Sequence, residues 1–231
     1  MKRGTGEPHA TQAGGGAGVR LLDLFCGRWG WARAFAARGW DCFGIDLQVP
    51  KEIPERCEFE QGDILHYHEG LMEGFDFIVA SSPCQEFSIH GMPHFHPNAK
   101  YPSMGIRLFN HTRELCEASG IPYVMENVLA AQWFVGESVN NCGPFHLWGT
   151  GVPPLMPQGI TKNMSQQRDA NGRRRGALEH VSKRERAAEG AKIPPELANC
   201  VADYAEALLR DKVAAGVSSA EGGDDARRRA E

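Results

Sequence analysis

A cysteine and a glutamate carry the most visible chemistry of this sequence. Cys84 stands in SSPCQEFSIHG (81–91), between a proline and a glutamine, where a core-packing role does not account for it. Glu126 directly follows the apolar run PYVM. A helix N-terminus lowers the pKa of a nearby thiol and favours the nucleophilic thiolate. An apolar pocket raises the pKa of a carboxyl group, which then acts as a hydrogen-bonding acid. The pair predicts nucleophilic catalysis, although a surface carboxylate is the alternative interpretation of Glu126.

A second set of residues indicates a nucleotide-like cofactor. The segment DLFCGRWGW (23–31) follows an apolar run and opens a helical pattern, so its glycines allow close backbone approach to a ligand. Asp46 ends the next apolar run, at the distance of roughly 20 residues where an acidic residue commonly binds ribose hydroxyls. A turn or cap role is the alternative for Asp46. Neither GxGxxG nor GxxxxGK[ST] occurs, which disfavours a dinucleotide or ATP.

The elements that position these residues alternate along the chain. Strands are expected over 19–25, 40–46, 59–64, 75–83 and 122–128, and helices over 31–39, 104–120 and 193–210. This alternation predicts an α/β fold, with a mostly parallel sheet and helices on both faces. Ligands of such sheets bind at the carboxyl ends of the strands, where Cys84, Glu126 and Asp46 fall.

Length and composition set the outer limits. The 231 residues suit one domain, expected over 19–212, with a disordered leader at 1–18 and a disordered tail at 213–231. The seven cysteines show no paired spacing and no secretory signal precedes them, which predicts free thiols and a cytoplasmic protein. No apolar run reaches the roughly 18 residues of a membrane span. His90, His94 and His96 lie close together without a carboxylate at a ligand spacing, so no metal site is expected.

Charge is distributed unevenly. The net charge is −4, but residues 161–192 hold nine Lys/Arg and four Asp/Glu, which makes that segment +5 and the remainder −9. Such a basic insert on an acidic body suits phosphate contact. A solvated loop explains the same composition, and both interpretations stay open.

Three short motifs, DLFCG, PCQEFS and ENV, follow one another on successive expected strands. In this order they closely resemble the DNA cytosine-5 methyltransferases. The resemblance covers about 19–130, and again 193–209, where IPPELANCV is similar to the family's last conserved block. It implies the Rossmann-like fold of methyltransferases that use S-adenosylmethionine, with that cofactor and with duplex DNA as the partner.

The resemblance also implies roles for particular residues. Cys84 attacks carbon 6 of a flipped-out cytosine, and Glu126 hydrogen-bonds N3 and the exocyclic amine. Carbon 5 then takes the methyl group, a base removes its proton, and Cys84 is eliminated. The residues assigned to the cofactor pocket are Asp23, Phe25, Gly27, Gly30, Asp46, Asp63, Ile64, Pro83 and Asn199.

The chain departs from the family pattern in two motifs. Trp29-Gly30 stands where the family has two glycines, which predicts a bulkier pocket wall. The QxRxR block has no clean copy. Either Gln166-Gln167-Arg168 or Arg173–Arg175 substitutes for it, or GPFHLWG (143–149) occupies its strand position instead. The residues assigned to nucleic-acid contact are Gln85, Ser88, Arg168, Arg173, Arg174 and Arg175.

The segment between Val128 and Ile193 is too short for a full target recognition domain. The chain thus resembles a compact member such as phage or mobile elements carry, expected to act as a monomer with short specificity or a specificity partner. The segment His90–Lys100 is expected to close over the flipped base. Two alternatives remain: an RNA cytosine-5 methyltransferase, which needs the same catalytic set, and a catalytically idle DNA-binding subunit. The Pro-Cys-Gln loop has no role in a small-molecule methyltransferase.

Overall fold

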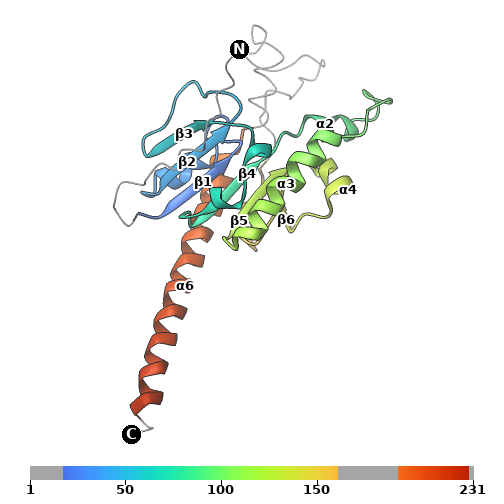
Figure 1. Cartoon of the computed structure of the whole chain (residues 1–231). Coiled ribbons are helices and arrows are strands. Elements are labelled where there is room, and N and C mark those ends of the chain that lie inside the picture. Colours follow the sequence, from blue (N-terminus) through green and yellow to red (C-terminus); the bar gives the residue numbers. More distant parts are fainter. Residues whose placement is uncertain (1–17, 161–191, 229–231) are drawn as a thin grey trace.

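The computed structural model describes residues 18–160 and 192–228, which form a seven-stranded sheet covered by helices (Figure 1). The strand order is β3-β2-β1-β4-β5-β7-β6. Pairing from β3 to β5 is parallel, whereas β7 is antiparallel to both β5 and β6. The strands are β1 (Arg20–Leu24), β2 (Asp41–Asp46), β3 (Cys57–Gln61), β4 (Phe77–Ser81), β5 (Tyr123–Asn127), β6 (Asn140–Cys142) and β7 (Phe145–Trp148).

Apolar side chains leave both faces of the central strands. Along β4, Phe77 and Val79 join one buried cluster, while Ile78 and Ala80 join the other. Successive side chains of a strand point to opposite faces, so a continuous apolar run produces a strand that is buried on both sides. The sheet therefore needs a layer of helices on each face.

Helices α1 (Ala32–Ala36) and α6 (Pro195–Arg228) supply one layer. Phe35 of α1 and Leu197, Ala198 and Val201 of α6 are all buried in the same cluster. The first part of α6 packs on the domain, and the remainder extends away from the sheet (Figure 1).

The opposite layer is built mainly by α3 (Ser103–Ser119), through Phe109, Leu115 and Cys116. Short elements complete it: η1 (Ile64–His66), η2 (Glu69–Met72), α2 (Gln85–His90), η3 (Leu129–Ala131) and α4 (Gln132–Val135). None of the helices in the described ranges combines the length and apolar character that a membrane crossing requires.

The structure confirms the α/β class and nearly all the expected strands and helices, and 143–149 does contain a strand, β7. Two local differences stand out. A helix, α2, begins directly after Cys84. Helix α6 continues to Arg228, past Val213, where the tail was expected to begin. The basic segment and the leader lie outside the described residues, so the division into domains stays a prediction.

Candidate active site

The centre of the sheet provides a natural ligand site. From β1 the chain proceeds to β2 and β3 on one side, and β4 and β5 lie on the other. In open α/β sheets, ligands bind beyond the carboxyl ends of the strands at this point where the strand order reverses. The loops that follow β1 and β4 meet there, and they carry the glycine segment 25–30 and Cys84, respectively.

The loop after β1 is held in an unusual conformation beside Asp46. Phe25, Gly27 and Trp29 all have left-handed backbones, with φ of 61°, 49° and 62°. The amide of Gly27 donates to Oδ2 of Asp46 at 3.0 Å, and Oδ1 of Asp46 accepts from the amide of Gln48 at 2.8 Å. Left-handed non-glycine residues are costly and concentrate at ligand sites. Each carboxylate oxygen of Asp46 keeps a lone pair for a ligand hydroxyl.

Trp29 does not wall the pocket. Its side chain is fully buried beneath the loop, with Nε1 donating to the carbonyl of Glu52 at 3.0 Å. The indole occupies the space beside Gly44, where an added Cβ would lie 2.4 Å from the ring. The prediction of a bulkier pocket wall is therefore wrong, because the missing side chain at Gly44 gives the indole a place in the core.

Gly30 and Asp23 lie below the same loop. An added Cβ at Gly30 would meet the Cβ of Ile193 at 3.0 Å, so this glycine admits the returning chain at the start of IPPELANCV. Asp23 is 1% exposed and its Oδ2 accepts from the amide of Ala32 at 3.3 Å. Burial raises the pKa of Asp23 well above its usual value, and the nearby Cys57 and Asp46 raise it further, against the amide of Ala32.

The donor set fits a cationic, ribose-bearing cofactor such as S-adenosylmethionine. Among the described residues, Oδ1 of Asp23 is a buried acceptor with no hydrogen-bond partner, which a positive group would favour. An added Cβ at Gly27 would meet nothing closer than 3.7 Å, so the loop backbone is open to approach. Asp46 lies beside the loop with the acceptor capacity that a ribose hydroxyl needs, while Asp23 is buried below the same loop.

Asp63 and Ile64 follow the next strand end along the same edge. The amide of Gly62 donates to the carbonyl of Asp46 at 3.1 Å, which ties the two loops together. Oδ1 of Asp63 accepts from the amide of Leu65 at 3.1 Å and caps η1. Ile64 is buried, and its carbonyl contacts Nε2 of His111 at 3.0 Å.

The loop that leads from β4 to Cys84 is fixed by a buried side-chain amide, that of Asn127, whose role the sequence did not indicate. Nδ2 of Asn127 donates to both the carbonyl and the hydroxyl of Ser82, each at 3.1 Å, and its Oδ1 accepts from the amide of Val128 at 2.9 Å. Nε1 of Trp31 donates to the hydroxyl of Ser81 at 2.9 Å. The asparagine of ENV was visible in the sequence, but its partner was not.

Cys84 and Glu126 come from neighbouring strands. Cys84 is half-buried and stands at the N-cap of α2, directly beyond the loop that Asn127 holds. Ser81, the last residue of β4, is the register partner of Glu126 in β5. The parallel pairing therefore places the half-buried Glu126 beside the start of the Cys84 loop.

The structure does not bring Asn199 to this edge. Asn199 is exposed on α6, where its Oδ1 accepts from Nη1 of Arg38 at 2.6 Å. Arg38 also pairs with Asp203 at 2.6 Å, and it follows the far end of α1, at the opposite edge of the sheet. Asn199 thus helps to anchor α6, and Ile193, at the start of the same segment, lies next to Gly30 of the loop.

The nucleic-acid candidates divide into two groups. On α2, Gln85 is exposed and Ser88 is half-buried, with its amide donating to the carbonyl of Cys84 at 2.8 Å. Pro83, assigned to the cofactor, is also exposed beside them. The assigned arginines, Arg168 and Arg173–Arg175, lie outside the described residues.

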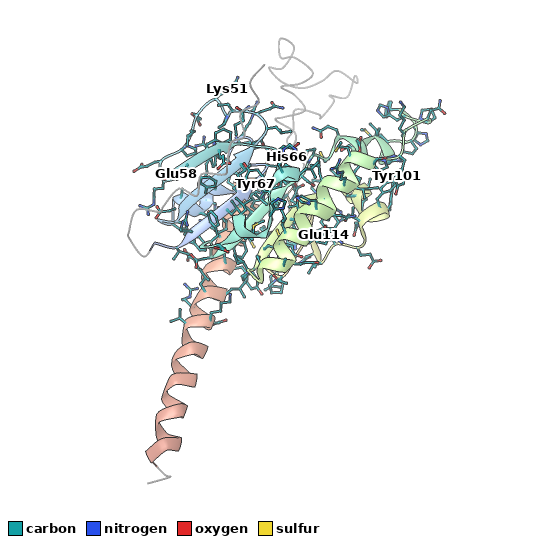
Figure 2. All side chains as sticks on the ribbon, in the orientation of Figure 1. Lys51, Glu58, His66, Tyr67, Tyr101 and Glu114 are labelled. Carbon is teal, nitrogen blue, oxygen red and sulfur yellow. The ribbon has the colours of Figure 1, made fainter. Side chains whose placement is uncertain are left out.

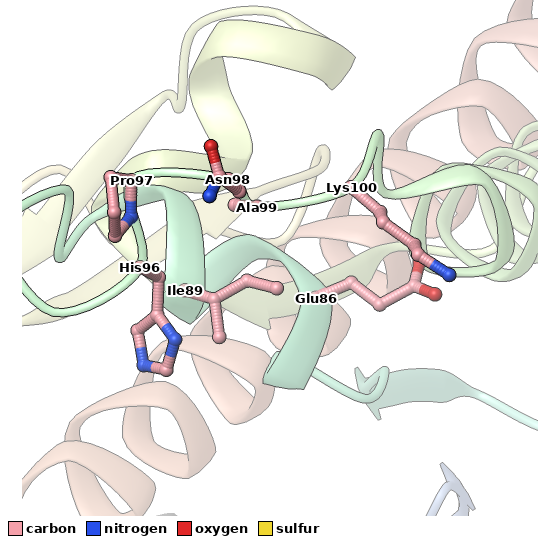
Figure 3. A pocket seen from close by; sticks show the side chains of 7 residues that line it. All are labelled: Glu86, Ile89, His96, Pro97, Asn98, Ala99 and Lys100. Atoms are coloured by element: carbon pink, nitrogen blue, oxygen red, sulfur yellow. The ribbon is translucent and has the colours of Figure 1, made fainter.

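A hollow of about 450 Å³ lies between α2 and the segment 96–100, lined by Glu86, Ile89, His96, Pro97, Asn98, Ala99 and Lys100 (Figure 3). A contact of 2.8 Å between Nε2 of His90 and the carbonyl oxygen of Lys100 joins the end of α2 to the end of this segment. The rings of His90 and Tyr101 pack edge-on against Phe134. Tyr101 lies where the segment enters α3 (Figure 2). Phe95, between these anchors, is 80% exposed.

Within the described part of the chain, no group of three or more His, Cys, Asp or Glu side chains is arranged to hold a metal ion. His94 and His96 are both exposed in the segment described above. The site is thus a thiol, a carboxyl group and a strained glycine loop at one sheet edge.

Fold and site together define the class, a Rossmann-like methyltransferase fold. Residues 19–131 match the family model of the C-5 cytosine-specific DNA methylases, which confirms the resemblance over this part of the chain. No curated protein sequence matches the chain.

Several solved structures share a weak likeness. A methyltransferase of Entamoeba histolytica, EhMeth, is 15% identical over 50% of this chain and 40% of its own, with a TM-score of 0.35. A DNMT2 mutant of Spodoptera frugiperda is 19% identical over 49% and 37%, with a TM-score of 0.35. The NAD-dependent dehydratase TunA is 22% identical over 46% and 36%, with a TM-score of 0.33. The chain spans less than half the length of each, and scores this low carry no argument.

We expect Asn127→Ala to slow catalysis, because the loop that leads from β4 to Cys84 would be positioned less well. The change leaves the Ser82 acceptors without their buried donor, which costs about 1–3 kcal/mol of unfolding free energy. The kcat for methyl transfer should fall about 10- to 100-fold, as expected for a misplaced reacting group, with KM for the cofactor unchanged. Steady-state kinetics and chemical denaturation measure both. Asn141→Ala, at an exposed asparagine, is the control; equal loss of kcat in both variants contradicts the positioning role.

Proposed function

We propose that the protein is a DNA cytosine-5 methyltransferase that acts through a covalent adduct of Cys84. The observation that carries the proposal is the pairing of Ser81 with Glu126, which sets a carboxyl group beside the Cys84 loop at the end of the central strands. The family match over residues 19–131 supports the same chemistry. The restraint of this loop by Asn127 suits a nucleophile that must be held for attack.

In the proposed reaction, the thiolate of Cys84 attacks carbon 6 of a cytosine that has left the duplex stack. Glu126 hydrogen-bonds N3 and the exocyclic amine and stabilises the charge that develops on the ring. Carbon 5 becomes nucleophilic and takes the methyl group. A base then removes the proton from carbon 5, and the bond between carbon 6 and Cys84 breaks, which restores the thiolate.

The cofactor that we propose, S-adenosylmethionine, supplies an electrophilic methyl group. The carboxylate of Asp46 would hold its ribose hydroxyls, and Gly27, where an added Cβ would meet nothing closer than 3.7 Å, would let the cofactor approach the loop closely. Asp63 and Ile64 would border its adenine, at the adjoining strand end. Phe25 takes its left-handed conformation at the mouth of this site.

We propose that α2 and the segment that follows it face the DNA. From Phe87 to Arg113 the sequence has no acidic residue, while it includes Lys100 and Arg107. The exposed ring of Phe95 offers a stacking surface for a base. Gln85 and Ser88 lie on the same helix, and the arginines of the basic insert remain the expected phosphate contacts.

Incubation with S-adenosylmethionine that carries a tritiated methyl group tests the proposal against its alternatives. We expect label in cytosine-containing duplex DNA, not in structured RNA of matched sequence, and none in DNA whose cytosines are already 5-methylated. A rise of melting temperature with the cofactor serves as the control for a folded, loaded protein. Label in RNA alone would establish the RNA alternative. DNA binding without label in either substrate would establish the idle subunit.

A further inference from the structure

Two free thiols face each other on the edge of the sheet remote from Cys84. Cys42 in β2 and Cys57 in β3 are register partners of a parallel pair. Neighbouring strands lie about 4.8 Å apart, and a disulfide needs a Cα separation of about 4.4–6.8 Å. Both side chains pack into the cluster under α1 and α6, so they share one face of the sheet.

The two thiols differ in access and in protonation. Cys42 is buried, whereas Cys57 is half-buried on the edge strand, next to Glu58 (Figure 2). A hydrogen bond from the Cys42 thiol lowers the pKa of Cys57, burial opposes it, and the charge of Arg33 lowers it further. The same contact raises the pKa of Cys42, and burial adds to the rise. The carbonyls of Ala32 and Trp40, at 3.6 and 3.8 Å from the Cys42 sulfur, are weaker alternative acceptors.

We propose that Cys42 and Cys57 form an oxidative modification site, at which a peroxide converts the two thiols into a disulfide between β2 and β3. The accessible sulfur reacts first and the buried sulfur resolves the product, which is the arrangement that thiol oxidation to a disulfide requires. The proposal concerns neither Cys84 nor methyl transfer.

The chemistry balances with hydrogen peroxide as the oxidant. The Cys57 thiolate attacks one peroxide oxygen, the O–O bond breaks, and the other oxygen leaves as hydroxide, which takes up a proton. The sulfur of Cys42 then attacks the sulfur of the Cys57 sulfenic acid, the S–O bond breaks, and hydroxide leaves with the proton of Cys42 as water. Two thiols are oxidised to one disulfide, and one peroxide is reduced to two waters.

Other cysteines provide an internal comparison. Burial raises the pKa of Cys116 to about 12, and it raises the pKa of Cys142 and of Cys200. These thiols remain protonated at neutral pH and react slowly with peroxide.

The test treats the reduced full chain with hydrogen peroxide, blocks residual thiols, and maps disulfides by mass spectrometry without reduction. Cleavage after arginine and after glutamate separates Cys57 from Cys84 in the sequence. We expect a cross-linked Cys42–Cys57 peptide, with Cys57 consumed at least about tenfold faster than Cys116. Cys42→Ser should stop the reaction at a Cys57 sulfenic acid that dimedone traps, and Cys57→Ser should leave Cys42 unmodified.

Absence of the Cys42–Cys57 peptide from oxidised wild-type protein overturns the proposal. So does consumption of Cys57 at the rate of Cys116, or a disulfide of Cys57 with any other cysteine as the main product. Because the decisive measurement uses the unsubstituted chain, a folding defect in either serine variant leaves the result interpretable.

Discussion

Replacement of Cys84 by alanine should reduce methyl transfer to DNA by at least about 10⁴-fold, the scale of loss seen when a catalytic nucleophile is removed. Carbon 5 of cytosine is a poor nucleophile until carbon 6 carries a covalent bond, so no other side chain can substitute for the thiol. The cofactor-dependent rise in melting temperature should remain, because the loop after β1 does not depend on Cys84. Radiolabel transfer and thermal denaturation measure the two effects.

A mechanism-based substrate makes the covalent step visible. Duplex DNA with 5-fluorocytosine should trap the wild-type protein as a complex that survives denaturation, since fluorine cannot leave as a proton does. Cys84→Ala should form no complex. Cys200→Ser, which changes another half-buried cysteine, is the matched control and should behave as wild type. Retained transfer in Cys84→Ala, or an active wild type that forms no adduct, contradicts the mechanism.

Replacement of Glu126 by glutamine should lower kcat by about 10²–10³-fold, the usual cost of losing one group that stabilises charge in a transition state. Glutamine keeps the shape of the side chain but cannot supply a proton toward N3 of the ring. Cofactor affinity should change little, because Asp46 and the Gly27 loop belong to other strands. The 5-fluorocytosine adduct should still form, with a rate lowered by the same factor.

Glu114→Gln is the matched control, because Glu114 is exposed on α3 (Figure 2). This variant should keep the wild-type rate. The role of Glu126 is refuted if both variants retain full kcat, or if Glu126→Gln raises KM for the cofactor while kcat stays constant.

The positions of the central strands along the chain, and the reactive residues that follow them, could be predicted from the sequence alone. Apolar runs such as VRLLDLF and FDFIVASSP predict strands buried on both faces, because apolar residues occupy both alternating sets of positions. Cys84, Glu126 and Asp46 are visible because reactive or charged residues interrupt those runs where each strand stops. Each of these residues can be recognised from its neighbours in the sequence. In the structure, Asp46 and Glu126 lie at the ends of β2 and β5, and Cys84 lies at the N-cap of α2, shortly after β4 ends.

The directions of individual side chains could not be predicted without the tertiary structure. Trp29 was expected at the pocket wall, yet the indole turns into the core, since Gly44 on the neighbouring strand leaves room for it. Asn199 was expected in the pocket, yet it pairs with Arg38, whose position depends on how α1 packs against α6. No local pattern encodes such contacts, because each partner lies far away in the chain.

The register of the sheet was likewise decided only by the fold. Pairing of Ser81 with Glu126 depends on hydrogen bonds between β4 and β5, and a shift by one residue would turn Glu126 to the other face. The register of β4 and β5 also lets Asn127 reach Ser82. In the other half of the sheet, the register of β2 and β3 places Cys42 opposite Cys57. The sequence thus determined which groups stand at the site, while cross-strand hydrogen bonding and packing decided which of them meet.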